Sequence, residues 1–255
     1  MPFEIRKLSV SLGGTRILHD VDCTLPPRGI TGIIGANGSG KTTLLRALAR
    51  LLLPESGQVL HQGQDIARLS ARGRARRIAM LPQTASAPPG LTVRQLVARG
   101  RTPWLRPFLP MTPKDHAAVD RALSAVGLQD LAGRSVDSLS GGQRQRAWIA
   151  LVLAQESGTI LLDEPLNFLD LPHQAELVAL LRELGQDRSV VMILHDLTIA
   201  ARVCHRVLAM RDGRLVAFGS AAEVLAPAPL RDTFGIAFDC AAMADGRAVV
   251  LPAGL

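Results

Sequence analysis

The segment Gly35-Ala36-Asn37-Gly38-Ser39-Gly40-Lys41-Thr42 constrains the fold of this chain more than any other. A short apolar run at 30–34 precedes it, and the apolar residues of 41–53 recur at helical spacing until Pro54. A strand, a glycine-rich loop and a helix in this order are the context of a phosphate-binding loop, whose backbone N–H groups face phosphate. We expect Lys41 to reach the β- and γ-phosphates and Thr42 to offer a hydroxyl to Mg²⁺. The residues expected to bind the nucleotide are Gly35, Asn37, Gly38, Ser39, Gly40, Lys41, Thr42 and Thr43.

The rest of the chain alternates strand and helix patterns. Residues 3–12 and 17–25 read as an N-terminal antiparallel β hairpin around Gly13-Gly14, and continuous apolar runs at 159–162 and 190–194 are typical of buried parallel strands. Helical spacing recurs at 113–126 and 142–155, after a Pro- and Gly-rich stretch. We therefore predict an α/β core. Its predicted limits are 1–85 and 149–225, with a helical subdomain at 86–148 and a C-terminal tail at 226–255 that carries no motif.

Composition excludes several classes of protein. The 255 residues are 47% hydrophobic and 20% charged, which predicts a globular chain, and no apolar run reaches the 18 residues of a membrane span. The N-terminus lacks a secretory signal, and the three cysteines form no CxxC pair, which fits a reducing cytosol. The net charge is +7, but aromatic residues are only 3% of the chain, so we expect no nucleic-acid partner.

Arginine is concentrated at 68–77, where five of the ten residues are Arg. Such a run is usually a solvated helix face. The alternative is attraction to anionic lipid or to the loops of a membrane partner.

Two acids end the apolar strand at 159–162, in the sequence Asp163-Glu164-Pro165. Strand ends at the carboxyl edge of an open α/β sheet are where ligands bind. We expect Asp163 to hold Mg²⁺ and Glu164 to be the general base that activates the attacking water. Helix capping is the alternative role for this pair.

The string Leu139-Ser140-Gly141-Gly142-Gln143 lies about a hundred residues after the glycine loop. The two motifs in this order resemble the nucleotide-binding subunit of ATP-binding-cassette (ABC) transporters, which are P-loop NTPases. The resemblance covers residues 3 to about 225, which would form a single ABC ATPase domain, 1–225. It implies that Ser140, Gly141, Gly142 and Gln143 contact the ATP of a second copy, from the start of a helix. A serine-capped helix start is the structural alternative.

The same resemblance assigns three further roles. His195, after the strand at 190–194, matches the switch histidine that contacts the γ-phosphate. Gln83 matches the glutamine that reaches Mg²⁺ and the attacking water. Asp170 matches the loop that joins the two half-sites of the dimer.

Two positions depart from the family pattern. Leu12 stands where an aromatic ring usually stacks on adenine, a contact worth about 1–3 kcal/mol, so nucleotide affinity is expected to be weaker unless the base finds another apolar contact. Leu166 replaces a usual threonine, and we expect hydrolysis to persist because that position supplies no catalytic group.

The run Arg99-Gly100-Arg101-Thr102-Pro103-Trp104 is similar to importers of iron–siderophore, haem and cobalamin chelates, with the ferric-siderophore branch favoured. The resemblance implies an ATP- and Mg²⁺-dependent subunit on the cytoplasmic face of the inner membrane, peripheral, bound to a multispanning permease and served indirectly by a periplasmic or extracytoplasmic binding protein. Haem or cobalamin import, an exporter, a non-hydrolysing sensor and a soluble ABC ATPase are the alternatives. Trp104 would either anchor its own loop or touch the permease.

Overall fold

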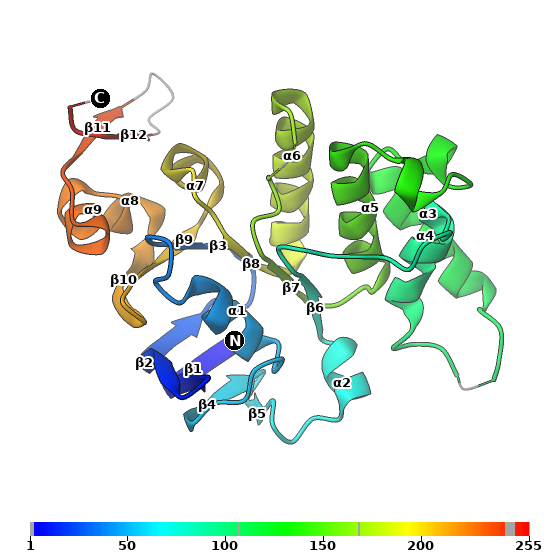
Figure 1. Cartoon of the computed structure of the whole chain (residues 1–255), viewed down its shortest axis with the longest axis horizontal. Helices are drawn as coiled ribbons and strands as arrows, with labels where there is room; N and C mark the ends of the chain where they lie inside the picture. Colours follow the sequence, from blue (N-terminus) through cyan, green and yellow to red (C-terminus); the bar gives the residue numbers. More distant parts are fainter. Residues whose placement is uncertain (1–2, 107, 168, 243–247, 255) are drawn as a thin grey trace. The chain divides into compact units, whose positions relative to one another are not determined.

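The computed structural model describes residues 3–106, 108–167, 169–242 and 248–254. The chain divides into two compact units, of which the first comprises residues 1–69 and 182–255 and the second residues 70–181 (Figure 1). Among the described residues, no helix is both long enough and apolar enough to cross a bilayer.

An antiparallel sheet opens the first unit. Strands β1 (Phe3–Leu12) and β2 (Thr15–Leu25) form the N-terminal hairpin that the sequence predicted, and β4 (Ser56–His61) and β5 (Gln64–Asp65) complete the order β2-β1-β4-β5. The turn works because Gly13 and Gly14 both have positive φ, 57° and 83°, which favours glycine.

Parallel pairing dominates the other sheet strands of this unit. Strand β3 (Gly29–Ile34) lies between β8 (Ser189–Ile193) and β9 (Arg206–Arg211), both parallel to it, and β10 (Arg214–Ser220) adds an antiparallel edge to β9. Every residue of β3 and β8 is buried. Burial on both faces explains their continuous apolar sequences, so this prediction is confirmed.

Helix α1 (Lys41–Leu48) is shorter than the helix predicted at 41–53. Its path breaks at Arg50, which takes a left-handed φ of 54°, and Leu51 and Leu53 are 65% and 67% exposed. The helical spacing of leucines therefore predicted too long a helix, because Leu51 and Leu53 do not pack on the core. Helices α7 (Leu197–Val203), α8 (Ala221–Val224) and α9 (Pro227–Phe234) complete the helices of this unit.

The C-terminal segment is folded where the sequence showed no motif. Helix α9 packs on β9 and β10, and a two-stranded hairpin of β11 (Phe238–Ala242) and β12 (Ala248–Pro252) follows, with β12 against α7. Phe238 and Val250 are buried, so the hairpin contributes its own small apolar contact. Both strands have only five residues, and β11 contains Asp and two Ala, which are depleted in strands, so the β signal of the hairpin is weak.

The second unit carries two parallel strands, β6 (Ile78–Leu81) and β7 (Thr159–Leu162), and a cluster of helices. The helices are α2 (Ala71–Ala75), α3 (Val93–Ala98), α4 (Pro113–Ala125), α5 (Gly141–Ala154) and most of α6 (Leu171–Asp187), with 3₁₀ turns at Arg99–Arg101, Gln129–Leu131 and Val136–Ser138. Helices α3, α4 and α5 pack on one another and match the helical pattern in the sequence. The limits 86 and 148 of the helical subdomain stay a prediction, and residue 148 lies inside α5.

Each of these three helices starts with a reciprocal cap. Thr92, Thr112 and Ser140 each accept a hydrogen bond from the backbone three residues on, and the side chain at that position returns one. Such boxes satisfy two N–H groups that would otherwise lack partners and fix where each helix begins.

A buried ion cluster centred on Arg101 holds the helices of this unit together. The Arg101 side chain is 3% exposed, and its Nε lies 3.0 Å from a carboxylate oxygen of Asp115. Its Nη1 donates to Glu156, at 2.7 Å, and to the carbonyl of Ala154, at 2.8 Å. Hydrogen bonds from Thr112 lower the pKa of Asp115 below its usual range, and Arg101 lowers it further by a smaller amount. Both charges are therefore compensated out of water, as buried ions require.

We predict that Asp115→Ala lowers the free energy of unfolding by about 3–5 kcal/mol, because it removes one of the two carboxylates that pair with the buried Arg101 charge, and the acceptor of the Thr112 hydroxyl with it. Asp120→Ala is the matched control on the same helix. Asp120 also pairs with an arginine, Arg94, but both partners are about half exposed, so its loss should cost about 1 kcal/mol or less. Urea denaturation followed by circular dichroism measures both, and equal losses would contradict the role of the buried cluster.

Candidate functional site

The glycine loop and Lys41 form a closed cradle between β3 and α1. Lys41 is 6% exposed, and its Nζ donates to the carbonyls of Gly35 and Ala36 at 2.9 and 2.8 Å. Gly35 has a φ of 148°, and a Cβ there would lie 2.2 Å from the carbonyl oxygen of Met210 and 2.7 Å from Ser39 Oγ. Only glycine fits this position, and the loop can therefore fold back over its own lysine.

The start of α1 suits an anion. Its N-cap is Gly40, no side chain caps it and no acid occupies its first turn, among the described residues. Ser39 Oγ is buried and has no hydrogen-bond partner in the described part of the chain. Unsatisfied helix N–H groups, a positive helix end and a buried hydroxyl without a partner are what a phosphate would complete. The residues present therefore fit the triphosphate of a nucleotide.

A turn distant in sequence braces this loop. Gly213, between β9 and β10, donates its N–H to the carbonyl of Ser39 at 3.1 Å and accepts from His19 N at 2.9 Å. Its φ is 72°, and a Cβ would lie 1.9 Å from the carbonyl of Ile17. Sequence patterns alone do not connect Gly213 with the site, although its Asp-Gly turn is a recognisable signal.

The strand register brings His195 to the same edge as the loop. Parallel pairing sets Ile33 beside Ile193, and Leu194 N donates to the carbonyl of Ile33 at 3.1 Å. His195, which follows β8, therefore lies at the same sheet edge as Gly35, which follows β3. The His195 side chain is exposed. Asp196 then caps α7 by accepting from Ile199 N at 2.9 Å.

In the second unit, parallel strand pairing likewise places Gln83 beside the acid pair Asp163 and Glu164. Leu81 pairs with Leu162, and Asp163 N donates to the carbonyl of Leu81 at 2.9 Å. Gln83 Nε2 then donates to Glu164 Oε2 at 3.0 Å. Asp163 is 1% exposed at this strand end, whereas Glu164 is only half-buried. The structure thus unites Gln83 with Glu164, two residues that the sequence assigned to one reaction.

Asn167 is a residue of this group that sequence reasoning missed. Its Nδ2 donates to Glu164 Oε2 at 2.5 Å, so two amides hold the same carboxylate oxygen. Glu164 itself has a left-handed φ of 54°, which is uncommon for a residue with a Cβ and often marks a functional site. An Asn three residues after the glutamate, in a turn, was the only available signal.

The segment 139–143, called the signature from here on, begins α5 as expected. Ser140 Oγ accepts from Gln143 N at 3.2 Å, and Gln143 Oε1 accepts from Ser140 N at 3.1 Å. Ser140 and Gly141 are exposed, with no Cβ at Gly141 to cover the helix end. Further along α5, Gln145 Nε2 donates to the carbonyl of Pro165 at 3.1 Å and ties the helix to the Glu164 turn.

Asp170 lies at the start of α6, and its neighbour Phe168 lies outside the described residues. The Asp170 carboxylate accepts from His173 N at 3.2 Å and contacts His173 Nδ1. Hydrogen bonding to His173 lowers the pKa of Asp170 below its usual range, so the side chain is held as an exposed anion.

Leu12 and Leu166, the two positions that depart from the family pattern, differ in burial. Leu12 is 41% exposed at the end of β1, where an apolar contact for a base remains a prediction. Leu166 is 7% exposed, and its carbonyl accepts from Gln174 Nε2 at 3.3 Å. Its side chain therefore serves packing.

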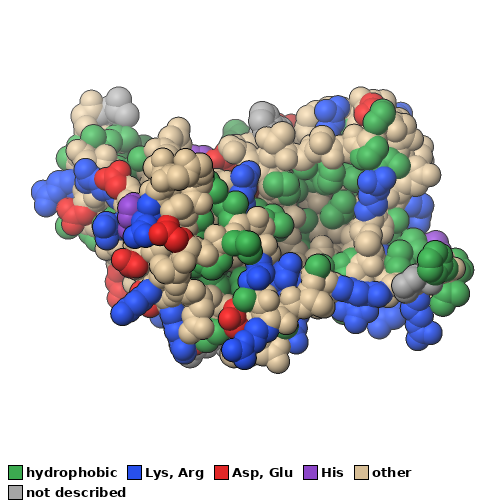
Figure 2. All heavy atoms as spheres, turned by 60° about the horizontal axis from the view of Figure 1, so that its bottom comes forward, with side chains coloured by type: hydrophobic (Ala, Val, Ile, Leu, Met, Phe, Trp, Pro, Cys, Tyr) green, Lys and Arg blue, Asp and Glu red, His purple; other side chains and the backbone are tan. Residues whose placement is uncertain are grey.

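Part of the arginine run does more than face solvent. Arg72 and Arg76 each donate through Nε to the carbonyl of Pro103 at 2.8 Å, and Arg76 lies over the Trp104 ring, 4.9 Å from its centroid. Trp104 Nε1 donates to the carbonyl of Gln155 at 2.8 Å. The ring is thus an anchor for its own loop. Figure 2 shows blue cationic side chains beside green hydrophobic ones at the lower right of its view.

Comparison with known proteins decides the family. The family described as "ABC transporter" matches residues 18–167, more than half of the chain. The chain belongs to the ABC transporter family.

Two curated relatives that align with this ABC ATPase over most of their length are named as transport proteins. It is 50% identical to the "Probable siderophore transport system ATP-binding protein YusV" of Bacillus subtilis, over 86% of this chain and 80% of the relative. It is 41% identical to the "Ferric enterobactin transport ATP-binding protein FepC" of Escherichia coli, over 97% and 93%. A solved dimeric bacterial ABC transporter cassette, MJ0796, superposes with a TM-score of 0.78 at 25% identity, over 86% of this chain and 98% of that one.

These similarities confirm the predicted fold class, a P-loop NTPase of the ABC type with mixed α/β sheets. They also establish an ATP-binding subunit that hydrolyses ATP to power transport. Subunits of this kind work as dimers with a separate membrane permease.

We predict that Asn167→Ala lowers kcat about tenfold while the Kd for ATP stays within about twofold of the unaltered protein. A hydrogen bond to a charged group is worth about 1.5–3 kcal/mol, and here it orients the carboxylate rather than the nucleotide. Phosphate release and fluorescent-nucleotide titration measure the two quantities. The control is Gln129→Ala, which removes an exposed amide bonded to Ser124. Equal kcat values for the two variants would exclude Asn167 from the site.

Proposed function

We propose that this ABC ATPase powers import of a ferric chelate, a ferric siderophore, through a separate permease. The observation that supports the hydrolytic part is the position of Glu164, whose carboxylate lies at a strand end and accepts hydrogen bonds from Gln83 and Asn167. The chelate class rests on relatives with siderophore and ferric enterobactin names over most of their length.

The reaction divides among residues of this chain. Lys41 and the loop N–H groups bind the phosphates, Glu164 orients the attacking water and takes its proton, and His195 donates to the γ-phosphate. Mg²⁺, when bound, neutralises charge on the β- and γ-phosphates. Thr42, Asp163 and the amide oxygen of Gln83 would hold it, and hydroxyl, carboxylate and amide oxygens are the donors that this hard cation prefers. The amide nitrogen of Gln83 already binds Glu164, which leaves its oxygen for the metal.

The signature of each copy would complete the site of the other. The loop at the start of α1 supplies its own anion site, so the second exposed helix start, at Ser140, Gly141, Gly142 and Gln143, is available to the ATP of a second chain. Asp170, an exposed anion at the start of α6, belongs to the surface between the copies in this arrangement.

The permease would meet the loop that follows Trp104. This loop exposes Phe108 and Leu109, at 106% and 56%, beside Arg106 and Lys114. Exposed apolar side chains rimmed by cations are typical of protein contact surfaces. The subunit would therefore lie peripherally on the cytoplasmic face of the inner membrane, and an extracytoplasmic binding protein would deliver the chelate to the permease.

We expect Glu164→Gln to lower ATP turnover by about 10²–10⁴-fold, the usual contribution of a general base. ATP affinity should persist, and the protein should collect as an ATP-bound dimer on size-exclusion chromatography. Glu183→Gln, an exposed acid outside the site, is the control. Unaltered turnover would remove Glu164 as the base.

The same variant tests transport. Cells whose only copy of this subunit carries Glu164→Gln should lose uptake of ⁵⁵Fe-labelled siderophore and keep uptake of labelled cobalamin. Loss of cobalamin uptake alone would overturn the ferric-chelate assignment while leaving the ATPase assignment intact.

We also expect Ser140→Asp to abolish ATP turnover while the monomer binds ATP with unchanged Kd. Aspartate caps a helix as well as serine does, so α5 is retained, but its charge would repel the phosphates of the partner's ATP. Ser140→Ala is the comparison, since it removes the cap without adding charge. If Ser140 only caps α5, Asp will be the more active of the two variants.

A further inference from the structure

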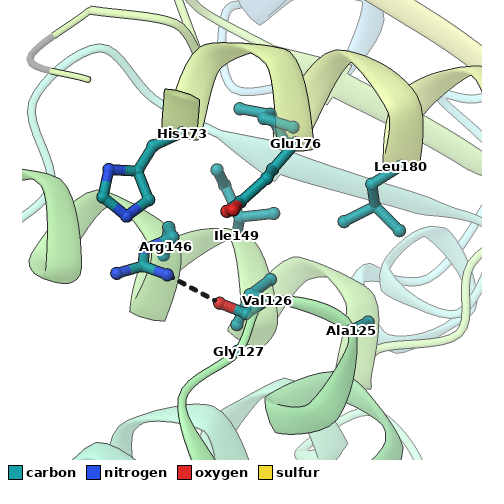
Figure 3. Close-up of a pocket in the computed structure, with 9 residues that line it drawn as sticks. Ala125, Val126, Gly127, Arg146, Ile149, His173, Glu176 and Leu180 are labelled. Carbon is teal, nitrogen blue, oxygen red and sulfur yellow. Dashed lines mark hydrogen bonds between the residues drawn. The ribbon is translucent and has the colours of Figure 1, made fainter. Parts of the chain in front are cut away.

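A cavity of about 260 Å³ lies among three helices of the second unit and is lined by none of the residues assigned above to ATP (Figure 3). The end of α4 supplies Ala125 and Val126, α5 supplies Arg146 and Ile149, and α6 supplies the opposite wall. The residues of that wall are His173, Glu176, Leu177 and Leu180. At about 30 Å³ per water molecule, the space suits a small molecule rather than a peptide or nucleotide.

Two opposite charges line this cavity without meeting. Arg146 on α5 and Glu176 on α6 both point into it in Figure 3, yet no ion pair joins them in the described part of the chain. The Arg146 side chain makes one hydrogen bond there, from Nη1 to the carbonyl of Val126 at 3.2 Å, while its Nε is buried without an acceptor. A guanidinium with a buried unsatisfied donor is costly, and an acceptor brought by a ligand relieves that cost.

The walls between these charges are apolar. Ile149 and Leu177 are 2% and 5% exposed, and Leu180 is half-buried beside them. A pocket with a few convergent polar groups on an apolar lining is the usual form of a small-molecule site. Because the polar groups carry opposite charge, a ligand of one charge only would leave one of them facing a like charge.

We propose that this cavity binds a small zwitterion with an apolar side chain, the chemistry of an aliphatic α-amino acid. The carboxylate pairs with Arg146, the ammonium pairs with Glu176, and the side chain lies against Ile149, Leu177 and Leu180. This site is independent of the transported substrate and of the ATP site.

The position of the cavity gives such a ligand a mechanical consequence. Arg146 lies on the helix that Ser140 caps, and His173 of the opposite wall binds Asp170. A ligand between α5 and α6 therefore braces the two segments that this chain is proposed to offer to its partner.

The test is isothermal titration calorimetry on the full chain without nucleotide, using three probes of matched shape. L-leucine carries both charges, 4-methylpentanoate lacks the ammonium, and 3-methylbutylamine lacks the carboxylate. Leucine should bind at least about tenfold tighter than either analogue, since each charge-assisted hydrogen bond contributes at least that factor. Absence of leucine binding, or equal binding of an analogue, would overturn the proposal.

Variants identify the site. Glu176→Gln should weaken leucine at least about tenfold and leave 4-methylpentanoate unweakened, whereas Arg146→Gln should weaken both. Leu180→Trp should block all three probes by filling the cavity. Glu183→Gln, an acid on α6 outside the cavity, should bind leucine normally. Since Glu176 is exposed, its variant should fold, and leucine binding unaffected by Glu176→Gln would place the ligand elsewhere.

Discussion

Parallel strand register is the constraint on which the chemistry of this chain depends. In the first unit the pairing of Ile33 with Ile193 makes the glycine loop and His195 leave the sheet at one edge. In the second unit the pairing of Leu81 with Leu162 does the same for Gln83 and Glu164. A one-residue slip would turn each following side chain to the other face of its strand, so the apolar strands fix the site as firmly as they fix the core.

The chain uses helix starts in two different ways. At α1 the cap is a glycine without a capping side chain, and the N–H groups are left for a ligand. At α5 a reciprocal Ser140–Gln143 cap already satisfies two of them. The first arrangement favours tight binding by the chain's own loop. The second keeps α5 stable alone and leaves a weaker anion site, which suits a contact made only when a second chain arrives.

The sequence predicted what local patterns encode. The glycine loop, the buried strands and the helices at 113–126 and 142–155 follow from periodicity and turn chemistry. The role predicted for Glu164 came from its position at a strand end, and that predicted for Ser140 came from the resemblance. The role of Asn167 was not predicted because its hydrogen bond to Glu164 depends on the left-handed backbone of Glu164, which the residue type does not indicate. Gly213 was not predicted because its partner, Ser39, is far away in sequence. The β11–β12 hairpin was not predicted because each strand has only five residues. The end of α1 was misplaced because leucines at helical spacing continue past Arg50 onto the surface.

Helix α5 connects the loop around Trp104, which is proposed above to meet the permease, with the signature. Arg101 and Trp104 donate to the carbonyls of Ala154 and Gln155, at the C-terminal end of the helix, where carbonyls lack intrahelical partners and cations are stabilised. Ser140 lies at the other end, fourteen helical residues away, about 21 Å at 1.5 Å per residue. A helix resists bending far more than a loop does, so displacement of the loop moves the whole rod and with it Ser140. The buried pair of Arg101 with Asp115 prevents the loop from yielding instead. In the arrangement proposed above, the loop would therefore transmit a partner's position to an ATP site that it does not touch.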